Sequence, residues 1–169
     1  YSYVWSNGSN TNVLNGLSVG TYSVSVTDAI GCVSNQSVTI TAPPLLSATM
    51  TGTNASCYGG NNGTSTVNPI GGNGPYTYLW SDGQTTSTAT GLTASPYTCI
   101  VTDANGCIFT TPTVTITEPS VISASITSTN VSCFGGSDAT AIVNSVGGNS
   151  GYSYVWSNGS NTNVLNGLS

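Results

Sequence analysis

The sequence lacks lysine, arginine and histidine altogether, and only five of its 169 residues are acidic. Because no cationic side chain is present to neutralise phosphates, we expect no nucleic-acid partner. The same absence excludes histidine-dependent triads and dyads, Schiff-base and P-loop lysines, and zinc sites that contain histidine. The net charge of −5 indicates solubility rather than a charged partner. We therefore predict that the protein is not an enzyme, with no catalytic residue and no cofactor.

The sequence also lacks a long hydrophobic run. No apolar stretch approaches the ~18 residues that a transmembrane helix needs, so we expect no membrane insertion in this segment. No signal peptide is visible, and the chain opens within a repeated pattern at Tyr1–Trp5, which suggests a piece of a longer exported chain. The chain does have hydrophobic residues at 37%, with many Val, Ile, Thr and Tyr residues, which favour strands.

An internal repeat organises the whole sequence. Residues 1–18 recur unchanged as residues 152–169, an offset of 151. A diverged copy lies halfway, since Trp5 matches Trp80 at an offset of 75, and Trp80 matches Trp156 at an offset of 76. A unit of about 75 residues in a tandem array accounts for these offsets. We predict part of a repeat at 1–43, a complete repeat at 44–119 and part of the next at 120–169.

One unit has the strand pattern of a small sandwich. Six or seven short strands separated by turns every 8–12 residues indicate an all-β fold of two packed sheets. The predicted strands are Leu46–Thr53, Thr64–Ile70, Tyr76–Trp80, Thr85–Thr90, Tyr97–Thr102 and Cys107–Thr117. Pro112 predicts a bulge or an edge within the last of them. We name two connections: the first loop (Asn54–Gly63) and the last hairpin turn (Asp103–Cys107).

The unit also fits an immunoglobulin-like sandwich. That fold places a Trp on its third strand and a tyrosine corner before its sixth, positions that Trp80 and Tyr97 occupy. Cys99 follows Tyr97 by two residues, but no cysteine lies on the second strand, and Val24 replaces Cys99 in the other unit. We therefore interpret Cys99 as a free buried thiol that fills a valine site. The predicted core aromatic residues are Trp5, Trp80, Trp156, Tyr22 and Tyr97.

These residues resemble a known family. The segment Pro75–Thr86 with its Tyr, Tyr and Trp, then Gly91-Leu92, Tyr97 and Val101–Cys107 are similar to the SprB repeat. Such repeats build very large surface adhesins of gliding bacteria of the Bacteroidota. The resemblance implies a parent that the type IX secretion system exports, that is displayed as a filament and that moves along the cell surface. Ser95-Pro96 departs from the usual Gly-Thr of the family.

Four cysteines form a periodic set. Cys57 and Cys133 lie in the first loop, and Cys32 and Cys107 end the last hairpin turn. Periodic cysteines in an exported chain predict disulfides. The pairing could join Cys57 to Cys107 within one repeat, or cross a boundary as Cys32–Cys57 and Cys107–Cys133. It could also join the first loop of one repeat to the last hairpin turn of the next.

The occurrence of one cysteine of each kind per repeat fits the first and third pairings alike. In a standard sandwich the first loop and the last hairpin turn lie at opposite ends, which favours the third. The boundary pairing is the least favoured.

The remaining candidate residues have ordinary explanations beside functional ones. Asp28 and Asp103 could join a calcium site, but we favour the simpler interpretation, in which each aspartate bonds its own turn backbone. We predict no metal site. Tyr1, Tyr3, Tyr76 and Tyr78 could stack on sugar rings, although their alternation with Trp5 and Trp80 places them in the core or at its edge.

The function that these observations favour is structural. We expect a repeat segment of a long cell-surface adhesin that holds an adhesive tip away from the cell and transmits force in adhesion or gliding. Its expected partners are the other repeats of the same chain, like chains beside it, and an extracellular surface or polysaccharide reached through the parent. One alternative is an array of polysaccharide-binding modules. Another is a set of accessory domains in a secreted hydrolase.

Overall fold

The computed structural model of the protein describes residues 1–169 and contains strands but no helix. The predicted all-β class is thus confirmed. No helix is present that has the length and apolar character needed to cross a membrane. Two compact units divide the chain, Tyr1–Leu45 and Leu46–Ser169.

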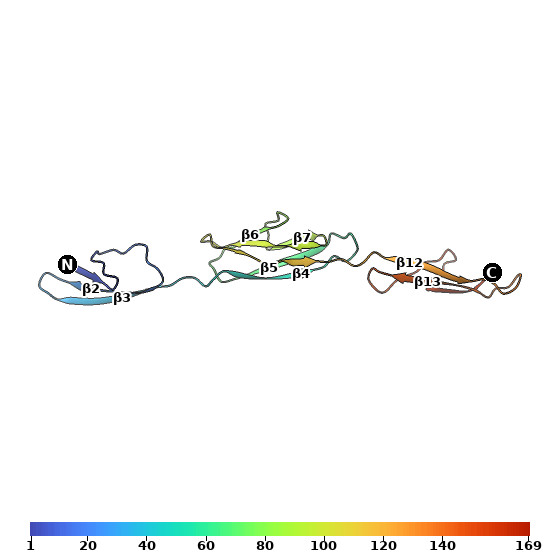
Figure 1. Ribbon diagram of the computed structural model, residues 1–169, viewed down its shortest axis with the longest axis horizontal. Coiled ribbons are helices and arrows are strands. Elements are labelled where there is room, and N and C mark those ends of the chain that lie inside the picture. The colour runs from blue at the N-terminus through green and yellow to red at the C-terminus, as the bar shows by residue number, and fades with distance from the viewer. The chain divides into compact units, whose positions relative to one another are not determined.

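The first unit is a single antiparallel sheet. Its strands are β1 (Ser2–Trp5), β2 (Gly20–Thr27) and β3 (Val33–Ile40), in the order β1-β2-β3 (Figure 1). Trp5 lies opposite Val24, and Tyr22 lies opposite Val38. The alternation of Tyr22, Val24 and Val26 along β2 places these three side chains on one face, as the two-residue period of a strand requires.

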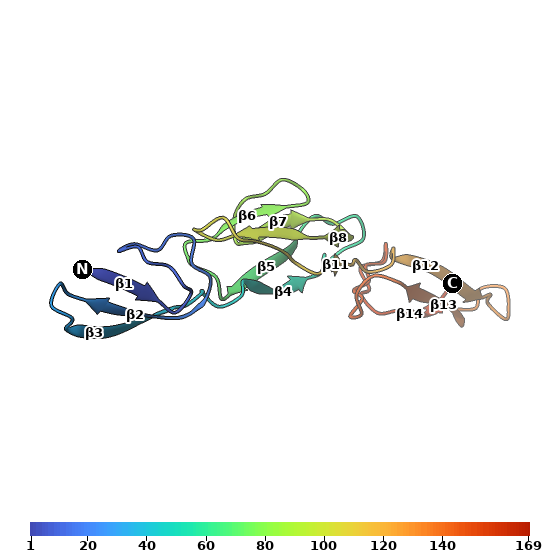
Figure 2. The ribbon, with the colours of Figure 1, turned by 60° about the vertical axis from the view of Figure 1, so that its left-hand side comes forward.

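Residues 46–119 form three small sheets. The first has the order β4-β5-β7 and the second the order β10-β9-β6, while β8 and β11 pair with each other (Figure 2). The bounds are β4 (Ser47–Thr53), β5 (Gly63–Ile70), β6 (Thr77–Trp80), β7 (Thr88–Leu92), β8 (Ser95–Tyr97), β9 (Cys99–Thr102), β10 (Ile108–Thr110) and β11 (Val114–Ile116).

One hydrophobic core joins these sheets. Side chains from both larger sheets and from the β8–β11 pair meet in it, an arrangement consistent with a β-sandwich. Val67 on β5 packs in the same cluster as Trp80 on β6 and Val101 on β9. The full set is Leu46, Val67, Trp80, Ala89, Leu92, Tyr97, Cys99, Val101 and Ile116.

Two predicted strands are each split in the structure. Tyr97–Thr102 divides at Thr98 into β8 and β9, and Cys107–Thr117 divides at residues 111–113 into β10 and β11. The break around Pro112 agrees with the expected bulge, since proline cannot donate to the ladder. The two breaks lie opposite each other in the sheet. As a result β8 pairs with β11 in one ladder, and β9 pairs with β10 in another.

A third predicted strand is displaced along the chain. Thr85–Thr90 was expected, whereas β7 begins at Thr88. The carbonyl of Thr86 accepts the indole N–H of Trp80 at 2.8 Å, and the Thr86 hydroxyl donates to the Thr88 carbonyl at 2.6 Å. These bonds hold residues 85–87 in a turn around Trp80, so the strand starts later.

Residues 120–169 repeat the first sheet of residues 46–119. The strands β12 (Ser123–Thr129), β13 (Ala139–Val146) and β14 (Val164–Leu168) have the order β12-β13-β14. Each begins at the same offset from its counterpart, since 123 − 47, 139 − 63 and 164 − 88 all equal 76. The structural repeat therefore has the same offset as the sequence repeat in this part of the chain.

Candidate functional site

The tryptophan of each repeat closes the same local turn. The indole N–H of Trp5, Trp80 and Trp156 donates to a carbonyl six residues later, at 2.8, 2.8 and 2.7 Å respectively. Trp80 is buried with 2% of its surface exposed, whereas Trp5 and Trp156 are half-buried. Trp80 lies on β6, which packs into a core built from several sheets. Trp5 and Trp156 lie in residues 1–45 and 120–169, each of which forms a single sheet.

A tyrosine hydroxyl reaches back along the chain in two repeats. The Tyr97 hydroxyl donates to the Thr93 carbonyl at 3.2 Å, and the Tyr22 hydroxyl donates to the Ser18 carbonyl at 3.1 Å. Tyr97 is buried, and Tyr22 is half-buried. Both bonds have the geometry of a tyrosine corner, a hydroxyl bound to the backbone a few residues upstream.

Some of the tyrosines considered for sugar stacking pack against the core or bond to the backbone. Tyr76 and Tyr78 pack against the core and are half-buried. The Tyr76 hydroxyl donates to the Gly71 carbonyl at 2.7 Å. Tyr3 is half-buried, and Tyr1 is 88% exposed. Tyr76 thus fixes the loop that precedes β6.

The last hairpin turn is built on one carboxylate. Asp103 Oδ1 accepts the backbone N–H groups of Asn105 at 2.9 Å and Cys107 at 2.8 Å. Asp103 Oδ2 accepts the N–H of Asn73 at 3.0 Å, and the Asn73 carbonyl accepts the N–H of Ala104 at 2.8 Å. Asp103 therefore does what the turn interpretation predicts, and it also clamps the Gly71–Gly74 loop against the turn.

These hydrogen bonds set the protonation state of Asp103. Desolvation favours the neutral acid, but the N–H groups of Cys107, Asn73 and Asn105 stabilise the carboxylate more and lower the pKa of Asp103. Asp28 in the first unit has the matching bonds from Ile30 at 3.0 Å and Cys32 at 2.8 Å. The turn is thus the same device in both units.

The first loop is fastened to the last strand of its own repeat. The Ala55 N–H donates to the Thr117 carbonyl at 2.9 Å, and the Thr117 N–H donates to Asn54 Oδ1 at 3.0 Å. The Gly59 N–H donates to Glu118 Oε2 at 2.7 Å. The first loop thereby lies beside Glu118, where the chain leaves the repeat.

A side chain closes the first loop internally. Asn62 Oδ1 accepts the Ser56 N–H at 3.0 Å, and Asp138 Oδ1 accepts the Ser132 N–H at the same distance in the following repeat. Hydrogen bonding from the side chain and backbone of Ser132 lowers the pKa of Asp138. Asn62 and Asp138 occupy equivalent positions of successive repeats, so the two residue types serve one structural purpose.

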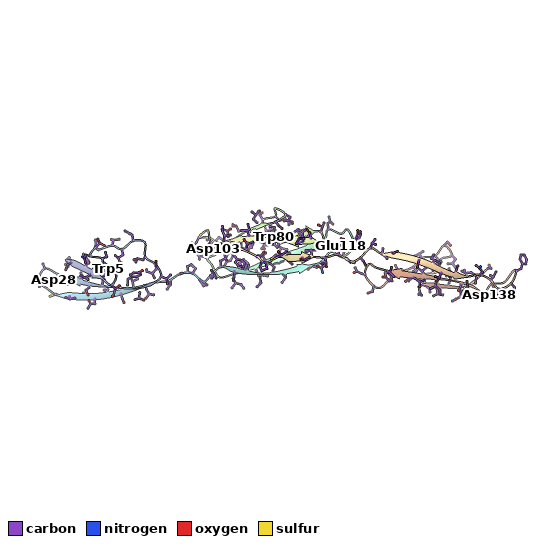
Figure 3. All side chains as sticks on the ribbon, in the orientation of Figure 1. Trp5, Asp28, Trp80, Asp103, Glu118 and Asp138 are labelled. Atoms are coloured by element: carbon purple, nitrogen blue, oxygen red, sulfur yellow. The ribbon has the colours of Figure 1, made fainter.

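The last hairpin turn and the first loop lie at opposite ends of residues 46–119. Figure 3 shows Asp103 at one end of this part and Glu118 at the other, with Trp80 between them. The last hairpin turn marks the end where the chain enters, because Asp103 Oδ2 and Leu46 both border Gly72. The first loop marks the end where the chain leaves, beside Glu118.

The cysteines occupy these ends and the core. Cys32, Cys57, Cys107 and Cys133 are exposed free thiols, whereas Cys99 is a fully buried one. Burial raises the pKa of Cys99, since desolvation disfavours the thiolate more than its hydrogen bonding favours it. Cys99 faces Trp80 across the β6–β9 ladder and fills the position of Val24.

The acidic residues do not gather. No three Cys, Asp or Glu side chains lie close enough together to hold a metal ion. The residues that organise the two ends are turn carboxylates, loop amides and exposed thiols. The fold and these ends define a class: a β-repeat protein whose repeats carry these residues at the ends where successive repeats are joined.

Comparison with protein families gives the particular family. The model of the SprB repeat matches residues 49–85 and residues 125–161, two stretches that start at equivalent positions of successive repeats. These two stretches thus match the SprB repeat, as the sequence predicted, and that family points to a repeat region of a cell-surface protein. The search of curated proteins finds no match.

Several structural residues escaped the sequence analysis. Asn73 bonds to Asp103, 30 positions away, and Glu118 bonds to Gly59, 59 positions away, so no local pattern identifies Asn73 or Glu118. Thr111 is buried, and its hydroxyl accepts the Cys99 N–H at 2.9 Å. Pro112 was the one sequence signal that pointed to the strand break at residues 111–113.

Proposed function

We propose that this chain is a force-bearing spacer segment in a long filamentous adhesin on the cell surface. In this proposal each repeat, of about 75 residues, is an immunoglobulin-like sandwich in a tandem array. The repeats hold an adhesive tip away from the cell during adhesion or gliding. The parent would be exported by the type IX route that the family resemblance implies. The segment itself carries out no catalysis.

The observation that carries this proposal is the tandem order of the SprB matches. Residues 49–85 and 125–161 match one family model, and the starts of these two stretches differ by 76. The strands β4, β5 and β7 begin 76 residues before β12, β13 and β14. A unit whose sheets and loops recur at one spacing supplies length in proportion to its number. Repetition of this kind is how solenoids and arrays build extended structures.

Three details support the immunoglobulin-like description. The sheet orders β4-β5-β7 and β10-β9-β6 correspond to strands A-B-E and G-F-C of that fold. Trp80 lies on the strand that corresponds to C, and the Tyr97 hydroxyl makes the bond of a tyrosine corner. These features favour a small sandwich with a stiff, hydrogen-bonded perimeter.

The linker favours the transmission of force between units. Only residues 117–122 separate β11 from β12, and they include Pro119. The Gly59 N–H and Glu118 bond ties the first loop to the start of this linker. A short linker that contains proline and is anchored at its entry limits bending at the junction.

Single-molecule force spectroscopy tests the proposal. We expect arrays of the duplicated two-repeat period to give evenly spaced unfolding events under reducing conditions, each lengthening the chain by on the order of 220 Å, from ~3.5 Å per residue less the folded length. Trp80→Ala in each copy should lower the force of the events from the repeats that contain Trp80, one in each period, whereas Leu79→Ala, at an exposed position on the same strand, should not. Extension without discrete events would contradict the proposal.

The polysaccharide-binding alternative has its own readout. The same arrays are incubated with insoluble cellulose and agar, and bound protein is measured against concentration. The spacer proposal expects no saturable binding by the repeats. Saturable binding that Tyr76→Ala abolishes, in a variant whose circular dichroism is unchanged, would assign the repeats to the binding class.

A further inference from the structure

We propose that neighbouring repeats are joined by a disulfide bond between the first loop of one repeat and the last hairpin turn of the next. In this chain Cys57 is one partner, and the other is the residue that corresponds to Cys32 and Cys107 in the repeat that follows. The bond depends on the tandem order of the repeats, not on what the parent adheres to, so it goes beyond the proposed function.

At the end where the chain leaves a repeat, the first loop presents Cys57 beside the linker. Cys57 is exposed, and it lies two residues before Gly59, whose N–H is bound by Glu118. The Gly60 N–H donates to the Cys57 carbonyl at 3.0 Å, which folds this part of the loop tightly. The thiol of Cys57 is therefore presented by a fixed loop directly beside the linker.

At the end where the chain enters the next repeat, the loop after β13 contacts the same linker. The Gly148 N–H donates to the Ser120 carbonyl at 2.7 Å, so the loop that follows β13 lies against the same linker. Gly148 and Asn149 correspond to Gly72 and Asn73 at the offset of 76. In residues 46–119 it is the loop with Asn73 that the last hairpin turn grips through Asp103.

A hydrogen bond joins the first loop of one repeat to the loop after β13 in the next. Asn149 Nδ2 donates to the carbonyl of Ser56, the residue before Cys57, at 2.7 Å. Cys57, Tyr58, Val121 and Asn149 line a groove of about 390 Å³. A last hairpin turn that binds Asn149 as Asp103 binds Asn73 therefore places its cysteine next to the groove that contains Cys57.

The alternative pairings are opposed by distance. Within one repeat Cys57 and Cys107 lie at opposite ends, and β4 alone has seven residues, or about 23 Å at ~3.3 Å each. A disulfide needs Cα atoms roughly 4.4–6.8 Å apart. For the boundary pairing, β10 and β11 lie between Cys107 and the linker that joins the two repeats. The strand β12 lies between that linker and Cys133, so the two cysteines are at the far ends of their repeats from the linker.

The chemistry balances with an external disulfide as the oxidant. A thiolate of one cysteine attacks glutathione disulfide, or the disulfide of an envelope oxidoreductase, and releases one thiol of that oxidant. The second cysteine then displaces the remaining half of the oxidant from the mixed disulfide. Two thiols of the protein lose two electrons and two protons, and the oxidant is reduced to two thiols.

The sequence duplication provides the experiment. Because residues 152–169 repeat residues 1–18, appending a copy of residues 19–45 after Ser169 completes the third repeat. The appended copy of Cys32 then stands at position 183, since 169 + 14 = 183, and its offset from Cys107 is again 76. The extended chain is oxidised with glutathione disulfide, alkylated, digested without reduction and analysed by mass spectrometry. Chymotrypsin is suitable, because the chain offers trypsin no lysine or arginine.

We expect one main cross-linked peptide, which joins Cys57 to position 183. The unextended chain and the extended chain with Cys57→Ser should both lack it, and Cys99→Ser should leave it unchanged. Hydrogen exchange of the appended strands serves as the test that the third repeat has folded. A Cys57–Cys107 bond, or an alkylated Cys57 in an extended chain whose third repeat is protected, would overturn the proposal. Either result would leave the spacer proposal to the force measurement.

Discussion

Asp103 shows at the scale of one residue how this nearly uncharged chain uses a charge. Its two oxygens accept three backbone N–H groups, from Asn73, Asn105 and Cys107. Charge-assisted hydrogen bonds of this kind are stronger than neutral ones. One carboxylate thereby fixes the last hairpin turn and holds a loop 30 residues earlier in the chain.

We predict that Asp103→Asn destabilises the repeat at neutral pH, and that this loss of stability becomes smaller at acidic pH. The pKa of Asp103 is lowered by folding, so its contribution is present above the unfolded value of about 3.9 and is lost as the pH falls through the folded value. Hydrogen exchange of peptides covering residues 97–117, measured from pH 7 down to pH 2, checks this.

Asp82→Asn is the matched control, since Asp82 bonds only to Gln84 within its own turn. It should change the exchange of residues 97–117 little at any pH. If the difference in hydrogen exchange between the unsubstituted protein and Asp103→Asn stays constant from pH 7 to pH 2, that result would contradict the role given to the Asp103 carboxylate.

The sequence predicted this aspartate as a turn residue but not its full role. The Thr-Asp-Ala pattern with Asn-Gly after it is a local signal, so the bonds to Asn105 and Cys107 could be expected. The bond to Asn73 depends on how the second sheet brings the Gly71–Gly74 loop alongside the turn. No pattern within either segment contains that information.

At the scale of the element, the broken strands around Thr98 and Pro112 are the main irregularity. The Thr111 N–H donates to the Cys99 carbonyl, and the Thr111 hydroxyl accepts the Cys99 N–H, both at 2.9 Å. Thr111 is 4% exposed. Its side chain thus supplies the hydrogen bond that the regular ladder would have given Cys99.

We predict that Thr111→Val destabilises the repeat by about 1–3 kcal/mol, because the Cys99 N–H is left buried without a partner. Urea denaturation with hydrogen exchange of residues 97–111 measures the loss. Thr110→Val is the matched control, because Thr110 is exposed on the same chain segment, and it should cost less than about 0.5 kcal/mol. Equal effects of the two variants would show that Thr111 has no special part in the break.

Regular strands were predictable where side chains alternate. Tyr76, Tyr78 and Trp80 gave β6 to within a residue, and the first two strands of the repeat were likewise placed to within a residue. The splits were not, because Thr110, Thr111 and Thr113 look alike in sequence. Which of them turns inward is decided by the switch of ladder partners, a property of the assembled sheets.

At the scale of the whole molecule, repetition is the feature that a spacer function requires. The exact duplication at an offset of 151 predicted a tandem array, and the SprB matches and the strand starts both recur at an offset of 76. The ends of the repeat were less predictable. The periodic cysteines pointed to disulfides, but only the positions of Glu118 and Asn149 favour one pairing over the others.

The most direct test of the spacer account is solution scattering from arrays of one, two and three of the duplicated two-repeat periods. Each repeat should add on the order of 35–40 Å, from strands of roughly six to eight residues at ~3.3 Å each plus end loops. We therefore predict a maximum dimension that rises in equal steps of about 70–80 Å per period. A maximum dimension that grows only with the cube root of the mass, as for a compact globule, would contradict the account.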